Sequence, residues 1–113
     1  MSYFKTKPVR SKKLRDAARG EACTIGLPCC DGGGETSVLA HLPDESHGIS
    51  RKSDDISACI GCDPCHAVID GRDRNSDSAR EFQEHREFYM RRAQTRTWRR
   101  LYELGLIVIK GAA

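Results

Sequence analysis

The sequence is poor in the large apolar side chains that usually build a protein core. Leu, Ile, Val and Phe together number 21 among 113 residues, and aromatic residues make up only 6%. No apolar run is long enough to cross a bilayer or to act as a signal segment, so we expect a cytoplasmic protein with no membrane partner. One domain is the default at this length, and its apolar burial is a weak source of stability. Something besides the core must stabilise the fold.

Six cysteines offer that additional stabilisation. In a cytoplasmic protein, thiols usually serve a metal ion rather than disulfides. We therefore predict a small domain held together by zinc.

The net charge of +3 is small, but it is unevenly distributed along the chain. Residues 1–20 carry +6, residues 21–70 carry −7 and residues 71–113 carry +4. Basic flanks of this density fit contact with a nucleic-acid backbone, and an acidic centre with cysteines and histidines suits a divalent cation. An ordinary solvated surface explains the charge pattern equally well.

Local patterns predict several short elements followed by one long helix. Residues 1–11 are basic and lack an apolar period, which predicts a flexible arm, and residues 12–113 form a single domain. From Phe82 to Leu104, residues that include His85 recur every three or four positions, which is typical of one helix face. The other predicted elements are a helix at 12–19, loops at 23–34 and 43–55, strands at 36–42, 56–60 and 106–109, and a short helix at 64–70.

The cysteine spacing predicts a metal site built from two separate pairs. Cys62 and Cys65 form a C-x-x-C knuckle, and Cys59 precedes Cys62 at the same spacing, so Cys59 and Cys62 are a competing pair. The other pair must come from Cys23, Cys29 and Cys30. Two such pairs, about thirty residues apart, would complete a tetrahedral zinc site. Buried free thiols acting as small apolar groups are the alternative.

Two histidines and an aspartate surround this cysteine pattern. His41 ends a predicted strand, His66 directly follows Cys65, and Asp70 lies one helical turn further on. A neutral imidazole at His41 can take a proton from water, while His66 and Asp70 can hold a catalytic Mg²⁺ or Mn²⁺. Surface histidines, or His66 as a zinc ligand in place of a cysteine, are the alternatives.

The motifs resemble those of a known family of small phage and prophage proteins. Residues 35–42 (ETSVLAHL), the Asp55-Ile56 pair and residues 62–72 (CDPCHAVIDGR) resemble the YbcO-like family. That family is similar to HNH nucleases, which are also called His-Me finger or ββα-metal enzymes. The resemblance implies an α+β fold: a small zinc-stabilised ββα-metal domain with a long C-terminal helix.

The resemblance also implies roles for individual residues. His41 would be the general base, Asp55 would take the middle position of the H-N-H signature, and His66 would bind the catalytic cation. Ala40 stands where the superfamily commonly has an acidic metal ligand, and Asp70 or His85 could supply that ligand. The implied zinc ligands are Cys23, Cys30, Cys62 and Cys65, with Cys29 and Cys59 spare.

Together these features predict a metal-dependent DNA endonuclease of phage or prophage origin that acts in recombination or repair. Trp98 is a candidate for stacking on an unpaired base, although a tryptophan more commonly anchors a core or an interface. The residues expected to contact phosphates are Lys12, Lys13, Arg15, Arg51, Lys52, Arg92, Arg96 and Arg99. Recombination proteins and a second copy of the chain are further partners to consider. The alternatives are a non-enzymatic zinc module that binds DNA or a recombination partner, and an interaction protein whose arginine-rich helix docks on an acidic partner.

Overall fold

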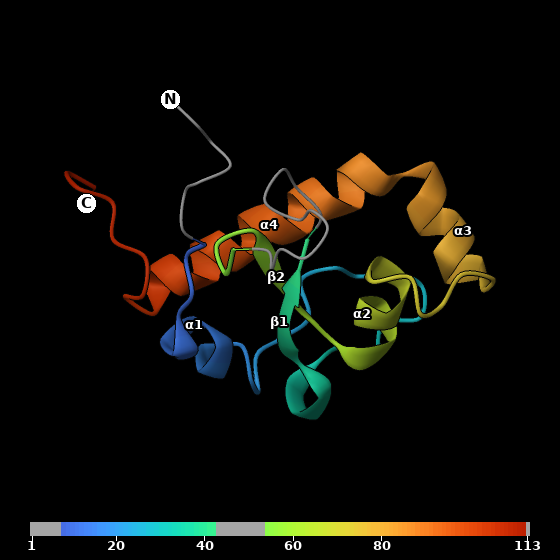
Figure 1. The fold of residues 1–113 in the computed structure, drawn as a ribbon, viewed down its shortest axis with the longest axis horizontal. Coiled ribbons are helices and arrows are strands. Elements are labelled where there is room, and N and C mark those ends of the chain that lie inside the picture. The colour runs from blue at the N-terminus through green and yellow to red at the C-terminus, as the bar shows by residue number, and fades with distance from the viewer. Residues whose placement is uncertain (1–7, 43–53, 113) are drawn as a thin grey trace.

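The structure is a computed structural model that describes residues 8–42 and 54–112. Its two strands form one hairpin, and its helices surround that hairpin (Figure 1). In chain order the elements are α1 (Lys12–Ala17), the 3-10 helix η2 (Gly34–Thr36), β1 (Val38–His41), β2 (Ala58–Gly61), α2 (Asp63–Ile69), α3 (Asp77–Glu84) and α4 (Arg86–Glu103). No helix in the described ranges is long and apolar enough to cross a membrane.

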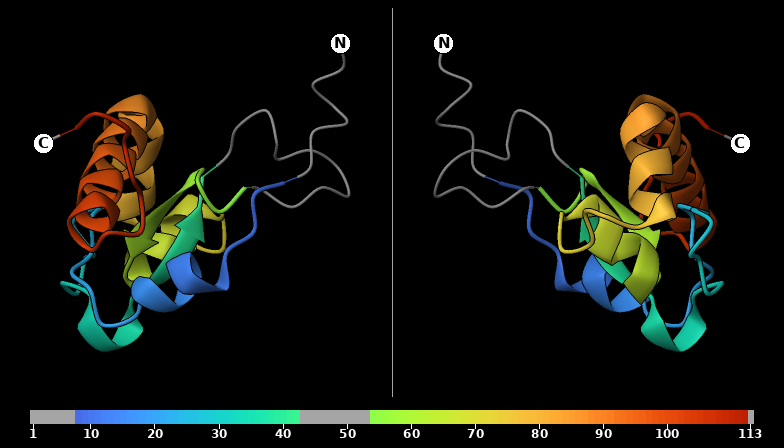
Figure 2. Two further views of the ribbon diagram at one scale, coloured as in Figure 1. Left: turned by 90° about the vertical axis from the view of Figure 1, so that its left-hand side faces the viewer. Right: turned by 90° about the vertical axis from the view of Figure 1, so that its right-hand side faces the viewer.

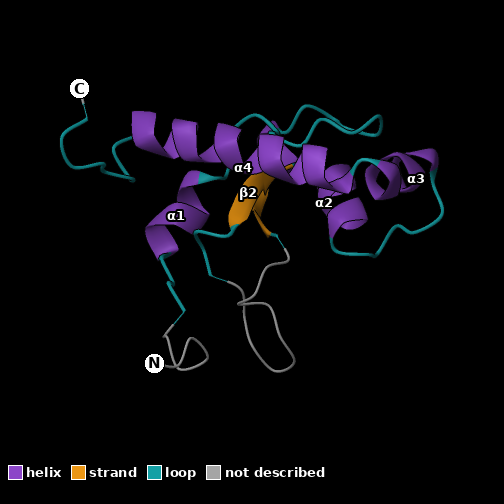
Figure 3. Ribbon diagram, turned by 90° about the horizontal axis from the view of Figure 1, so that it is seen from above, coloured by secondary structure: helices purple, strands orange, loops and turns teal. Residues whose placement is uncertain are grey.

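The hairpin is antiparallel and pairs His41 with Ala58 at the end where β1 leads into the segment that connects it to β2. Side chains alternate between the two faces of a strand, so Leu39 and His41 share one face of β1 while Ala40 faces the other way. Helix α4 packs against β2, and α1 packs beside β1. Figures 1 and 3 both show α1 towards one end of the molecule and α3 towards the other, with the hairpin between them.

Two small apolar clusters form the core, one on each side of the hairpin. The first contains Ile25, Ala40 and Phe82 together with buried cysteines, and the second joins Leu14 of α1 to Leu101 of α4. The clusters are small, as the apolar content predicts, and polar contacts supplement them.

One of these polar contacts fixes α4 to the hairpin. Thr97 is buried, and its hydroxyl accepts a hydrogen bond from the Ile60 amide at 2.9 Å and lies 3.1 Å from the Thr24 hydroxyl. Figure 2 shows α4 running along one side of the hairpin. The predicted apolar face is confirmed for the α4 residues Tyr89, Ala93, Thr97 and Leu101, which are all buried.

The predicted single long helix is wrong, because the chain forms two helices that meet at His85. The backbone of His85 leaves the helical region, with φ −129° and ψ 37°. Helix α3 also begins before the apolar period does, because the Ser76 hydroxyl caps it by accepting from the Ala79 amide. His85 is exposed rather than part of the apolar face, so it does not occupy the position that the periodicity predicted.

Two predicted strands also differ from the structure. The first is shorter, because Thr36 belongs to η2 and its hydroxyl donates to Asp31 at 2.9 Å. Residues 106–109 form no strand; the amides of Leu106 and Ile107 both donate to the carbonyl of Leu101. Alternation alone could not distinguish a strand from this turn after the helix.

The predicted flexible arm lies partly outside the described residues. Its last residues are anchored, since the Val9 amide donates to the Asp54 carboxylate at 2.6 Å and the Asp55 amide donates to the Val9 carbonyl at 2.8 Å. Ser11 then caps α1 by accepting from the Leu14 amide. The described part of the arm is therefore attached to the domain.

Candidate functional site

Four cysteines from three parts of the chain meet beside the hairpin. Cys23 and Cys30 come from the loop before η2, Cys62 directly follows β2, and Cys65 lies in the first turn of α2. Their four sulfur atoms all lie within 4.8 Å of one another. The cluster thereby ties the N-terminal loop to the point where the hairpin passes into α2.

The spacing of the sulfurs fits a zinc ion. Tetrahedral zinc with zinc–sulfur bonds of about 2.3 Å sets its ligand sulfurs about 3.8 Å apart. Cys30 Sγ and Cys62 Sγ are 3.8 Å apart, and the Gly32 amide donates to Cys30 Sγ at 3.3 Å. Hydrogen bonds, the largest from Cys65, lower the pKa of Cys23 to about 4, which favours the thiolate that a metal requires. The cluster can hold a metal ion such as zinc.

The two spare cysteines lie outside this cluster, which decides between the pairs that the sequence left open. Cys59 is buried within β2, and burial raises its pKa to about 12, as expected for an inert thiol. Cys29 lies next to Cys30, but its sulfur is not part of the cluster. Its backbone amide donates to the Ser78 hydroxyl at 2.9 Å. The cluster therefore contains Cys30 and Cys62 rather than Cys29 and Cys59.

A close backbone approach shapes the loop that carries Cys23 and Cys30. Gly33 has φ +88°, and a Cβ there would lie 2.5 Å from the Cys23 nitrogen. Ala22 and Gly33 form an isolated antiparallel bridge at this point. Only glycine fits both the conformation and the space at position 33, which explains the middle one of the three successive glycines.

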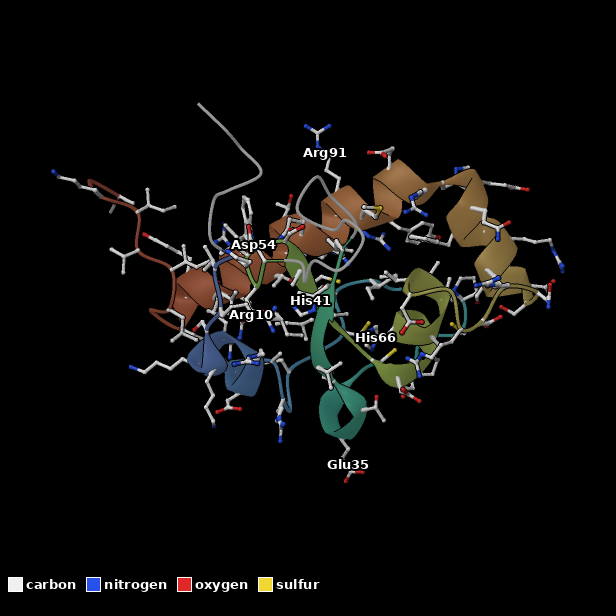
Figure 4. All side chains as sticks on the ribbon, in the orientation of Figure 1. Arg10, Glu35, His41, Asp54, His66 and Arg91 are labelled. Carbon is white, nitrogen blue, oxygen red and sulfur yellow. The ribbon has the colours of Figure 1, made fainter. Side chains whose placement is uncertain are left out.

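His41 lies at the end of β1, where the strand leads into the segment that connects it to β2, and it contacts a buried carboxylate. Its Nε2 is 2.8 Å from Asp55 Oδ1, and its side chain is partly exposed while that of Asp55 is 0% exposed. Because a carboxylate only accepts hydrogen bonds, Nε2 carries the proton of a neutral His41 and Nδ1 is left as an acceptor. Figure 4 shows His41 on the hairpin between Arg10 and His66.

Asp55 is held in the ionised form by its neighbours. Burial raises the pKa of its carboxyl, but the Ser11 amide, His41 and the positive charge of Arg10 outweigh burial and bring the pKa below the ordinary value. The Ser11 amide donates to Asp55 Oδ2 at 2.6 Å. Asp55 is therefore a charged group, out of contact with solvent, that fixes the orientation of His41.

His66 and Asp70 lie on one face of α2, as the spacing predicted. His66 Nε2 is 3.6 Å from Asp70 Oδ2, and burial lowers the pKa of His66 although the nearby Asp70 carboxylate opposes this effect. A neutral imidazole is the form that binds a metal. Asp70, however, accepts two hydrogen bonds from Arg72 Nε, at 2.8 and 3.1 Å.

The described residues do not bring these groups together as a ready three-ligand cation site. Among them, only two groups of three or more metal-binding side chains lie within ligand distance of one another, and neither includes His41, Asp55, His66 or Asp70. The second group is Glu81, Glu84 and His85 where α3 meets α4. This second group is largely exposed. Because it lies at the junction of α3 and α4, His85 belongs to a different part of the molecule from His66, which lies in α2.

The predicted phosphate-binding residues separate into several environments. Arg92 donates to the Ile25 carbonyl at 2.8 Å and covers the rings of Phe88 and Tyr89, so its contacts are structural. Lys12, Lys13, Arg96 and Arg99 are exposed, but the first two lie on α1 and the others on α4. Arg51 and Lys52 lie outside the described residues. Trp98 is 48% exposed, with its indole donating to the Ile56 carbonyl at 3.1 Å.

Sequence reasoning treated the basic N-terminal residues, Arg10 and Arg15 among them, only as general phosphate contacts. Both guanidinium groups approach Asp55, at 3.9 Å for Arg10 and 3.7 Å for Arg15. The one local feature that could have located this segment is Ser11, a typical N-cap residue that fixes the chain direction just before α1. The partner of this segment, 44 residues away, had no local signal.

These features define a small domain with a four-cysteine cluster that can hold a metal ion and a partly exposed histidine paired with a buried aspartate. A model of the family described as "Putative nuclease YbcO" matches residues 12–106. That match covers most of the 113 residues, and the chain belongs to this YbcO family.

Individual relatives agree with this assignment. Two curated proteins described as "Putative nuclease YbcO", from Escherichia coli (strain K12) and from Enterobacteria phage 82, are each 46% identical to the chain over 61 residues. Each match covers 52% of this chain but 64% of the relative, which is less than two thirds of its length. A solved structure from Escherichia coli K-12, described as a "putative bacteriophage protein", has a TM-score of 0.61 at 35% identity and covers 82% of this chain and 100% of its own.

Proposed function

We propose that this protein is a metal-dependent endonuclease that hydrolyses phosphodiester bonds in DNA. The observation that carries the proposal is the 2.8 Å contact between His41 Nε2, at the end of β1, and the buried Asp55 carboxylate. A histidine held in one tautomer by a carboxylate is a common form of general base. Membership of a family described as nucleases supports the same reaction class.

In the proposed reaction, Nδ1 of His41 takes a proton from a water molecule. The oxygen of that water attacks the phosphorus atom, and the bond between phosphorus and the leaving ester oxygen breaks. Asp55 remains ionised and stabilises the imidazolium that forms at His41. The proton on His41 then returns to solvent or to the leaving oxygen, so the enzyme ends in its starting form.

A Mg²⁺ or Mn²⁺ ion would bind at His66, with Asp70 as the other protein ligand. Such an ion supplies Lewis-acid stabilisation of the charge on the phosphate and the leaving oxygen. Burial keeps His66 neutral, which suits ligation, and hard cations commonly keep waters and substrate oxygens among their ligands. Asp70 would have to exchange part of its contact with Arg72 for the ion.

The order of the elements supports an HNH-type assignment within this proposal. A hairpin leads directly into α2, with His41 ending β1 and His66 lying in the helix. In this reading zinc at the cysteine cluster is structural, because it joins the hairpin to α2 and thereby fixes His41 relative to His66. The phage relative supports a phage or prophage origin, and our proposal extends this origin to recombination or repair of such DNA in the bacterial cytoplasm.

A specific observation favours a second candidate function, a non-enzymatic zinc module that binds DNA. Ala40 is 0% exposed and packs within the first core cluster. The superfamily commonly has an acidic metal ligand at this position, and the chain offers no carboxylate there. Without it, the protein could keep the scaffold and bind DNA without cutting it.

A plasmid-nicking assay tests the proposal directly. We expect the zinc-loaded wild type to nick supercoiled plasmid with Mg²⁺ or Mn²⁺, and His41→Ala to lower the rate by about 10²–10⁴-fold. His85→Ala is the matched control, because this exposed histidine lies at the α3–α4 junction, and it should cleave like the wild type. Equal nicking by wild type and His41→Ala would refute the assigned base. Absence of nicking by the wild type on plasmid, branched and single-stranded DNA would favour the binding module.

A further inference from the structure

The described part of the N-terminal segment lies against the same carboxylate that holds His41. Three hydrogen bonds attach it: Val9 to Asp54 at 2.6 Å, the Asp55 amide to Val9 at 2.8 Å, and the Ser11 amide to Asp55 Oδ2 at 2.6 Å. Ser11 is the N-cap residue of α1, and this helix continues the segment from Lys12. These hydrogen bonds therefore fix the position of the segment beside the His41–Asp55 pair.

Two arginines of this segment converge on Asp55. Arg10 Nη1 is 3.9 Å from Oδ1, the oxygen that also contacts His41, and Arg15 Nε is 3.7 Å from Oδ2. The Asp55 side chain is 0% exposed, whereas those of Arg10 and Arg15 are 34% and 45% exposed. Each guanidinium thus reaches from the buried carboxylate to the surface beside His41, and Figure 4 shows Arg10 on that side.

Both guanidinium groups face Asp55 from beyond hydrogen-bond distance, at 3.9 Å for Arg10 and 3.7 Å for Arg15, while the neighbouring Asp54 carboxylate accepts from the Val9 amide. A phosphodiester carries one negative charge, and guanidinium groups bind phosphate oxygens through paired N–H donors. The lysines of α1 differ, because Lys12 is 82% exposed and pairs with Asp16 at 2.7 Å.

We infer that Arg10 and Arg15 bind the phosphodiester on which His41 acts, so that residues 8–15 form part of the active site. This inference rests on the proposed nuclease function and extends it to the residues that position the substrate. The two guanidinium groups hold non-bridging phosphate oxygens beside His41 and stabilise the negative charge that builds up during attack. The basic N-terminal segment thereby acts at the reacting phosphate itself rather than only along the DNA backbone.

A binding measurement tests this without depending on cleavage. The zinc-loaded protein, without Mg²⁺ or Mn²⁺, is titrated with the dinucleotide dTpdT, and the ring signals of His41 are followed by NMR. We expect a saturable shift in the wild type and a Kd raised about tenfold or more in Arg10→Gln and in Arg15→Gln, which corresponds to the loss of a charge-assisted contact. Arg80→Gln is the matched control, because this exposed arginine of α3 pairs with Asp77, and it should leave the Kd unchanged.

Lysine variants keep the test informative if a glutamine variant unfolds. Arg10→Lys and Arg15→Lys retain the charge facing Asp55 but lose the paired donors, so they should fold and still bind dTpdT several-fold more weakly. Absence of a His41 shift in the wild type, or equal Kd values in all variants, would overturn the inference. Plasmid nicking reports separately on the proposed function: a wild type that binds dTpdT through both arginines but never cleaves would refute the nuclease and leave the phosphate site standing.

Discussion

Asp55→Asn should reduce both the stability of the domain and the activity of His41. The carboxylate accepts two hydrogen bonds, from the Ser11 amide at 2.6 Å and from His41 at 2.8 Å. Hydrogen bonds to a charged group contribute about 1.5–3 kcal/mol each. Asparagine keeps one acceptor oxygen and presents an NH₂ group to the other partner, so one bond and the charge opposite Arg10 and Arg15 are lost. We expect a loss of about 2–4 kcal/mol, a large part of the roughly 5–15 kcal/mol typical of a domain.

Urea unfolding followed by circular dichroism measures this loss, with zinc at one fixed excess because a bound metal adds to apparent stability. Asp16→Asn is the matched control, since Asp16 is an exposed carboxylate on α1 that pairs with Lys12, and it should leave the urea midpoint unchanged. Equal midpoints for Asp55→Asn and Asp16→Asn would refute the reasoning. Plasmid nicking by Asp55→Asn should fall by about 10²-fold or more, because Nε2 of His41 loses the partner that sets its tautomer.

The same variant gives a pH prediction. The pKa of Asp55 lies below its ordinary value of 3.8, so its contribution to stability is complete above that value and is lost as the pH falls through the lower pKa of the folded state. The stability difference between wild type and Asp55→Asn should therefore persist at pH 5 and shrink only below about pH 4. Protonation of the cysteine ligands affects both proteins and cancels in the difference. A difference that already disappears by pH 5 would contradict the assigned pKa direction.

Five further substitutions separate the roles that the structure gives to neighbouring residues. Cys30→Ser should abolish stoichiometric zinc in elemental analysis while Cys29→Ser retains it, and the reverse result would mean that the cluster is misassigned. Gly33→Ala should destabilise the protein by about 2 kcal/mol or more in urea, because its positive φ and a Cβ contact of 2.5 Å both oppose a side chain. Arg92→Gln should lower stability by about 1–2 kcal/mol through loss of its carbonyl and ring contacts. Arg96→Gln should instead leave stability unchanged and weaken salt-sensitive DNA binding, and an equal stability loss in both arginine variants would count against this division.

Several parts of the site follow directly from short-range sequence patterns. Cys62 and Cys65 are three positions apart, and that spacing in the first turn of a helix brings both sulfurs to one ion. His66 and Asp70 are four positions apart on α2 and share a face for the same helical reason. Family motifs marked His41 and Asp55, and the structure brings these two into contact.

Other parts depended on contacts that no local pattern encodes. Cys29 and Cys30 are adjacent, and the path of the glycine-rich loop decides which of the two sulfurs joins the cluster. The break at His85 interrupts a continuous apolar period, because the periodicity of side chains does not record the backbone angles at one residue. Arg92 looked like its neighbours in an arginine-rich stretch, but it packs against the Ile25 loop.

The sequence by itself therefore determined a small-core domain with cysteines spaced to hold a metal ion, a histidine ending the first strand and a second histidine in the following helix. These conclusions rest on spacings of three or four residues, which the geometry of one helical turn or one knuckle converts into proximity. Only the tertiary structure decided that Arg10, Ser11 and Arg15 surround Asp55. The two segments are 44 residues apart, and their meeting depends on how α1 packs beside β1, a contact between distant parts of the chain that local chemistry does not specify.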